Sequence, residues 1–160
     1  MKKSAVTACC LTGHLAILAS EIPRLCRRLR DGICYLHSRG VTVYYAGGAL
    51  GFDTLAAEAV LDCRSVFPDI QLAVVMPCRD QGKYWRREEI QKYEGILAQA
   101  DRVVCLSEHY TKGCMQRRNR YLVEHSTYCI CYLDRTSGGT AYTVYYAKNR
   151  GLTVYNLKGK

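Results

Sequence analysis

The chain has 160 residues, 49% of them hydrophobic, and it carries 23 Lys and Arg against 14 Asp and Glu. This length can bury a full hydrophobic core, and so apolar a composition excludes an intrinsically disordered chain. The net charge of +9 favours an anionic partner, either a small nucleotide, a single-stranded nucleic acid or an acidic surface. Basic residues that only keep the surface hydrated are the simpler interpretation of the same charge.

Strands and helices alternate along the predicted chain. Apolar, β-branched and aromatic runs predict strands over residues 5–11, 41–45, 70–76, 102–106, 128–133 and 152–157. Helical periodicity predicts helices over residues 20–39, 52–67, 84–100, about 114–126 and 140–149. Ser20 is the expected N-cap of the first helix, with Pro23 in its first turn.

The predicted strands are almost continuously apolar, which indicates a parallel sheet covered by helices on both faces. We therefore expect an α/β fold: a single three-layer, Rossmann-like domain over residues 1–160, with a mostly parallel sheet of about six strands. Right-handed crossovers then place every strand-to-helix loop at the carboxyl edge of the sheet.

The ten cysteines do not form a disulfide pattern, since Cys9 and Cys10 are adjacent and Cys129 and Cys131 alternate within a strand. Such cysteines are typical of small buried hydrophobes in a reduced, cytoplasmic protein. No C-x-x-C or Cys/His ligand spacing occurs, so we expect no metal site. The apolar stretch before Cys9 is too short for a signal peptide and no run is long enough to span a bilayer, so we expect no membrane contact.

A glycine turn with Gly47, Gly48 and Gly51 connects the second predicted strand to the next helix. Glycines there allow a phosphate to approach backbone N–H groups at the positive end of a helix. The turn matches neither the dinucleotide fingerprint nor a P-loop, so a plain tight turn is the alternative. Asp53 is expected either to cap the helix or to accept hydrogen bonds from ribose hydroxyls or backbone amides.

A second glycine turn follows the fifth predicted strand. Two such turns at one sheet edge suggest a phosphate cradle, and two plain short turns fit the same spacing equally well. The second turn comprises Ser137, Gly138, Gly139 and Thr140. At the same edge, Thr12, Gly13 and His14 close the first strand and offer a hydroxyl and an imidazole. Arg79 and Arg118 are the expected charge partners of an anion. Arg117, Arg118 and Arg120 lie close together on one predicted helix, but at most two of them can share its crevice-facing side. The single Trp, Trp85, either stacks on a base or packs in the core.

Five motifs, taken in order, resemble the SLOG superfamily and, within it, the small bacterial YpsA-like group. They are CCLTGH (9–14), GGALGFDTLAAE (47–58), PCRDQ (77–81), GCM with RNRY (113–121) and SGGTAYT (137–143). The resemblance covers nearly the whole chain and implies a Rossmann-like domain that binds a nucleotide-related ligand. Relatives include DNA-processing protein A, which handles single-stranded DNA, and the cytokinin-activating phosphoribohydrolases.

Two departures from that pattern shape the functional hypothesis. Residues 137–144 lack the proline and the catalytic glutamate of the phosphoribohydrolase motif P-G-G-x-G-T-x-x-E, and Leu15-Ala16 stands where the group has Arg-Pro. The leading hypothesis is therefore a regulatory module that senses ADP-ribose, NAD or a nucleoside phosphate, with no catalytic residue assigned. A nucleotide-cleaving hydrolase and a single-stranded DNA binder are the alternatives, and a homodimer stays open.

Overall fold

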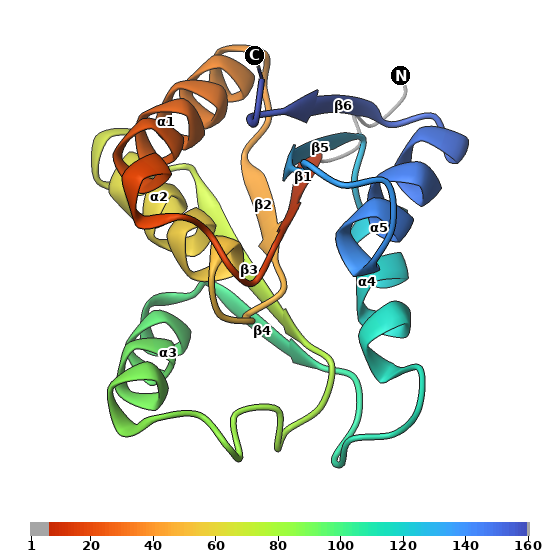
Figure 1. Ribbon diagram of the computed structural model, residues 1–160. Coiled ribbons are helices and arrows are strands. Elements are labelled where there is room, and N and C mark those ends of the chain that lie inside the picture. The colour runs from red at the N-terminus through yellow and green to blue at the C-terminus, as the bar shows by residue number, and fades with distance from the viewer. Residues whose placement is uncertain (1–6, 160) are drawn as a thin grey trace, which may run out of the picture.

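The computed structural model describes residues 7–159 (Figure 1). In chain order its elements are β1 (Ala8–Gly13), a 3-10 helix (Ala19–Glu21), α1 (Ile22–Ser38), β2 (Val43–Ala46), α2 (Phe52–Val66), β3 (Gln71–Met76), α3 (Arg87–Gln99), β4 (Arg102–Cys105), α4 (Cys114–Glu124), β5 (Tyr128–Tyr132), α5 (Gly139–Asn149) and β6 (Thr153–Asn156). Ala5 and Val6, the start of the first predicted strand, lie outside the described residues.

The strands form one six-stranded sheet in the order β4-β3-β2-β1-β5-β6, and every neighbouring pair is parallel. This confirms the predicted α/β, Rossmann-like fold. The chain moves outward from β1 to β4 and then returns to place β5 on the other side of β1. Because the loops after β1 and β5 diverge at this reversal, it is the position where open α/β sheets form ligand crevices.

Helices cover both faces of the sheet. Figure 1 shows α1, α2 and α3 on one side and α4 and α5 on the other. Successive side chains of β1 point to opposite faces of the sheet. Leu11 packs toward α1 and α2, and Cys10 packs toward α4 and α5. The inner strands β1, β2, β3 and β5 are thus largely apolar on both faces, which accounts for their continuous apolar runs in the sequence.

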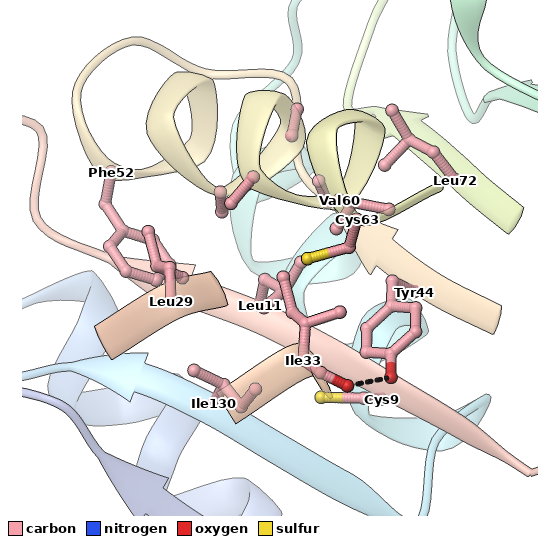
Figure 2. Close-up of a cluster of buried hydrophobic side chains, with 14 of the residues drawn as sticks. Cys9, Leu11, Leu29, Ile33, Tyr44, Phe52, Val60, Cys63, Leu72 and Ile130 are labelled. Carbon is pink, nitrogen blue, oxygen red and sulfur yellow. Dashed lines mark hydrogen bonds between the residues drawn. The ribbon is translucent and has the colours of Figure 1, made fainter. Parts of the chain in front are cut away.

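The larger of the two cores lies between the sheet and helices α1 and α2. Figure 2 shows Leu29 and Ile33 of α1 and Phe52 of α2 packed against the strands. Tyr44 of β2 is fully buried there, and its hydroxyl donates to the backbone oxygens of Ile33 and Val41, each at 3.1 Å. These bonds remove the cost of burying an unpaired hydroxyl and fix α1 against β2.

Two helices begin later than predicted. The helix α1 begins at Ile22, because residues 19–21 form a 3-10 turn and no side chain caps the helix, so the expected N-cap role of Ser20 is wrong. The helix α3 begins at Arg87, because Glu89 accepts a hydrogen bond from the Arg86 amide at 2.9 Å and so fixes the start. None of the helices between residues 7 and 159 is long and apolar enough to cross a membrane.

Candidate functional site

A crevice of about 330 Å³ opens at the carboxyl edge of the sheet, at the reversal between β1 and β5. Its walls come from the end of β1, the loops after β1 and β5, the first turns of α2 and α5, and one face of α4 from Met115 to Leu122. The lining residues are Thr12, Gly13, His14, Leu15, Ala16, Ala49, Asp53, Met115, Arg118, Asn119, Leu122, Arg135, Ser137, Gly138, Gly139 and Thr140.

The crevice brings together most of the residues that the sequence predicted for a binding site. It gathers Thr12, Gly13, His14, Asp53, Arg118, Ser137, Gly138, Gly139 and Thr140, which come from four separate segments. Gly47, Gly48, Gly51 and Arg79 do not line it. The two glycine turns, which look alike in the sequence, therefore occupy different environments.

Arg118 is the most deeply placed cation of the crevice, with 4% of its surface exposed. From the start of α4 its Nη1 donates to the backbone oxygen of Gly47, and its Nε donates to Asn119 Oδ1 at 2.8 Å. Among the described residues 7–159, the hydrogen bonds of Arg118 use these two nitrogens and none uses Nη2. A Cβ at position 47 would lie 2.5 Å from Nη1, so glycine is required there to admit the guanidinium.

Asp53 faces the same point from α2. Its Oδ2 accepts a hydrogen bond from the Ala49 amide at 3.2 Å, which is one of the roles expected for this carboxylate. The other expected role, the N-cap of α2, falls to Gly51. Burial raises the pKa of Asp53, and the charge of Arg118 and the Ala49 amide oppose that rise. Burial likewise lowers the pKa of Arg118, which the charge of Asp53 opposes. Each buried charge therefore stabilises the other.

The start of α2 is covered by the protein itself. The Phe52 amide, in the first turn, donates to the backbone oxygen of His14 at 3.1 Å. A Cβ at Gly51 would lie 2.0 Å from the backbone oxygen of Leu15. Gly48 points elsewhere, and its backbone oxygen accepts a hydrogen bond from Gln81 Nε2 at 3.2 Å. The loop after β1 thus occupies the place where the sequence predicted a phosphate.

The start of α5 is open to the crevice. No side chain caps this helix, and no heavy atom lies within 4 Å of a Cβ built at Gly138 or Gly139. An uncapped helix start presents unpaired N–H groups and a partial positive charge. Arg135, in the loop before the turn, adds a guanidinium to the same wall. Arg135 was not among the predicted site residues, although its place in the loop after β5 is a signal that could have found it.

His14 joins the two loops that flank the crevice. Its Nε2 lies 3.1 Å from the Asp134 amide nitrogen and 2.9 Å from Asp134 Oδ1, so it accepts from the amide or donates to the carboxylate according to its tautomer. Burial lowers the pKa of His14, while the negative charge of Asp134 acts in the opposite direction. The imidazole therefore fixes the loop after β1 to the loop after β5.

Arg79 and Trp85 lie outside the crevice. Arg79 is exposed, and its Nε lies 3.1 Å from Glu108 Oε2, so the pair joins the loop after β3 to the loop after β4. Trp85 packs edge to face on Tyr93 with ring centroids 5.1 Å apart, which favours its packing role over base stacking. Among the described residues, no three His, Cys, Asp or Glu side chains are grouped to hold a metal ion.

The fold and the crevice define a Rossmann-like α/β domain with a crevice at the reversal of its strand order. Residues 19–157 match the model of the YspA SLOG family (YpsA), and the chain belongs to this family. This confirms the resemblance inferred from the ordered motifs.

The chain is also similar in sequence to bacterial UPF0398 proteins. A UPF0398 protein of Halalkalibacterium halodurans is 34% identical over 121 residues, which cover 74% of this chain and 64% of the relative. The UPF0398 protein YpsA of Bacillus subtilis is 30% identical over 116 residues, which cover 71% of this chain and 64% of that protein. The matched region thus spans slightly less than two thirds of these relatives.

Solved structures show the same fold at low sequence identity. The match to DNA processing protein A from Helicobacter pylori covers 92% of this chain and 63% of that chain, with a TM-score of 0.65 and 19% identity. The structure of that protein was reported for its single-stranded DNA binding mode. DNA processing protein A from Streptococcus pneumoniae matches 93% of this chain and 49% of its own with a TM-score of 0.66 and 16% identity.

Proposed function

We propose that this protein binds a nucleotide-type ligand, with its phosphate between the Ser137–Thr140 turn and Arg118. The observation that carries the proposal is the uncapped start of α5, which faces the same crevice as a buried guanidinium with an unused Nη2. Helix starts and arginines both favour phosphate oxygens, the first through backbone N–H groups and the second through a planar set of donors.

The size of the crevice limits the ligand. At about 330 Å³ it lies near the lower end of the range for small-molecule sites, so a mononucleotide suits it better than a dinucleotide. Met115 and Asn119 of α4 line the wall next to Arg118 and offer an apolar surface and an amide to a base or ribose. Of the three proposed ligand types, we therefore rank nucleoside phosphates ahead of ADP-ribose and NAD.

Substitution at Gly139 tests the proposal. This position has an ordinary backbone conformation and open space around its Cβ, so both Gly139→Asp and Gly139→Ala should fold. A carboxylate about 5 Å from a phosphate near a protein surface costs about 3 kcal/mol. Isothermal titration with nucleoside monophosphates, nucleoside diphosphates, ADP-ribose and NAD should give at least a tenfold weaker affinity for the Asp variant, by about 1.4 kcal/mol or more.

Matched controls keep this test specific. Gly139→Ala measures the effect of a Cβ without the charge, and the Asp variant should bind more weakly than it does. Arg135→Ala should weaken binding, and Arg79→Ala should leave it unchanged, since Arg79 pairs with Glu108 outside the crevice. The absence of binding at millimolar ligand, or an Asp variant that binds as tightly as the Ala variant, would contradict the proposal.

Asp53 keeps a hydrolase as a second candidate. A buried carboxyl with a raised pKa on a crevice wall is a recurrent feature of acid–base sites, although structural ion pairs produce it too. The α5 turn itself carries no carboxylate, since residues 137–144 are SGGTAYTV. Release of free base or ribose phosphate from the same nucleotides, lost in Asp53→Asn, would favour the hydrolase over binding alone.

A basic and aromatic surface on α1 supports single-stranded DNA binding as a third candidate. Arg24, Arg27 and Arg30 are exposed on this helix, whose last turns carry Tyr35 beside Tyr155 of β6, with ring centroids 6.3 Å apart. Arginines that contact phosphates and tyrosines that stack on bases are the usual components of such a surface. It lies on the α1 side of the sheet, away from the crevice residues.

The two surfaces can be separated with one oligonucleotide. If α1 binds single-stranded DNA, Tyr35→Ala should weaken oligonucleotide binding measured by fluorescence anisotropy and leave nucleotide binding intact, whereas Gly139→Asp should do the reverse. The oligonucleotide affinity should also fall steeply between about 50 and 200 mM salt. A flat response to salt would argue against this candidate.

A further inference from the structure

Two cysteines on neighbouring helices lie close enough to react with each other. Cys34 of α1 and Cys63 of α2 have their sulfur atoms 3.9 Å apart, at the contact between the two helices. A disulfide bond is about 2.05 Å long, so the sulfurs need to approach by about 2 Å. Rotation of the exposed Cys34 side chain can supply most of this movement.

The two thiols differ in their access to solvent. Cys34 is exposed, whereas Cys63 is 4% exposed and lies in the core shown in Figure 2. Burial raises the pKa of Cys63 to about 12, and the neighbouring Cys34 contributes to that rise. A dissolved oxidant therefore meets Cys34 first, while Cys63 stays protonated beside it.

We propose that Cys34 and Cys63 form a site of reversible oxidation by a peroxide. The Cys34 thiolate attacks one oxygen of hydrogen peroxide: an S–O bond forms, the O–O bond breaks, and the released hydroxide takes a proton to become water. Cys63 sulfur then attacks the oxidised Cys34 sulfur: an S–S bond forms, the S–O bond breaks, and the leaving hydroxide takes the Cys63 proton as a second water. Two thiols lose two electrons, and one peroxide becomes two waters.

Other neighbouring thiols lack this combination of an exposed and a buried sulfur. Cys10, Cys129 and Cys131 lie next to one another on β1 and β5, and all three are fully buried. Cys78 and Cys114 also face each other, with exposed fractions of 0% and 4%. Within residues 7–159, the contact between α1 and α2 therefore offers a peroxide the best access to a thiol that has a partner.

The crosslink would join the two helices that cover one face of the sheet. It would connect residues 29 positions apart, so it would restrict the unfolded chain more than the folded one. The oxidised protein should therefore melt at a higher temperature than the reduced protein, and dithiothreitol should reverse the change.

The experiment treats the folded full chain with hydrogen peroxide, alkylates the remaining thiols and maps crosslinked peptides by mass spectrometry. We expect the peptides of Cys34 and Cys63 to be crosslinked, with the Tm raised by several degrees. Cys34→Ser should prevent the crosslink, and Cys63→Ser should leave a sulfenic acid on Cys34 that dimedone traps. Cys26→Ser, a control on the same helix, should crosslink as the parent does.

The proposal is overturned if Cys34 is oxidised without forming the bond to Cys63, or if other cysteine pairs form as readily. Melting curves of the reduced variants show whether each one folds. Because Ser and Cys are nearly the same size, loss of the crosslink in a variant with a normal melting curve reports the chemistry rather than the fold.

Discussion

Single glycines decide which parts of this chain come into contact. Gly47 admits the Arg118 guanidinium, and Gly51 admits the backbone of Leu15, whereas Gly139 faces open space. The sequence predicted both glycine turns at the sheet edge. It could not show which turn is open, because the group that approaches a glycine comes from a distant part of the chain.

Gly51 and Gly40 offer a matched pair for testing this distinction. Both have positive φ, +71° and +93°, but a Cβ at Gly51 meets the Leu15 oxygen at 2.0 Å, whereas a Cβ at Gly40 meets nothing within 4 Å. Gly40→Ala should lower the free energy of unfolding by about 1 kcal/mol through backbone strain alone. Gly51→Ala adds a steric clash and also strains a backbone conformation of φ 71° and ψ −124°, so it should cost about 3 kcal/mol or more.

Urea denaturation of the two variants and the parent measures both losses. If the two substitutions cost the same, the loop after β1 yields easily, and the close contact between Gly51 and Leu15 does not stabilise the crevice wall. A larger loss at Gly51 is the result expected from the contact with Leu15 together with the glycine-only backbone conformation of Gly51.

At the scale of elements, periodicity predicted the order and type of the six strands and five helices, because each buried face leaves its own apolar spacing. Helix starts were less predictable. Ser20 has the right chemistry for an N-cap, but the helix begins two residues later and leaves it in a 3-10 turn. A helix start depends on which amide a side chain reaches, and this is decided by the path of the preceding loop.

The helix α4 shows the same limit within the site. Spacing predicted that at most two of its three neighbouring arginines could face the crevice. The helix register selects Arg118 alone: Arg117 is exposed, and Arg120 donates a hydrogen bond to the Tyr142 hydroxyl at 3.3 Å. The sequence thus predicted the segments that build the crevice, while tertiary packing decides which side chains enter it.

At the scale of the whole molecule, the crevice is the place where the two helical layers meet. Asp53 comes from α2 on one face of the sheet, and Arg118 comes from α4 on the other. Both side chains flank Gly47 just past the end of β2, between the layers. The pair therefore couples the two layers around the sheet edge, and its electrostatics should be visible in the stability of the entire domain.

Arg118→Met should make stability more sensitive to pH. Burial already raises the folded-state pKa of Asp53 above its ordinary value of 3.8, and Arg118 opposes that rise, so its removal should raise the pKa further. A group whose pKa is higher in the folded state binds its proton more tightly there, so the free energy of unfolding falls as pH rises through the folded-state pKa. The Met variant should therefore lose more stability than the parent when the pH is raised from about 4, near the ordinary Asp value of 3.8, to a value well above it.

Asp53→Asn and the double variant complete the cycle. With no carboxyl left to titrate, the double variant should lose the added pH dependence of Arg118→Met. The cost of the double change should differ from the sum of the single costs by about 1–3 kcal/mol, as expected for groups in one network. Urea denaturation of the four proteins at both pH values measures this coupling. Additive losses with unchanged pH profiles would mean that the two layers are held together by packing alone.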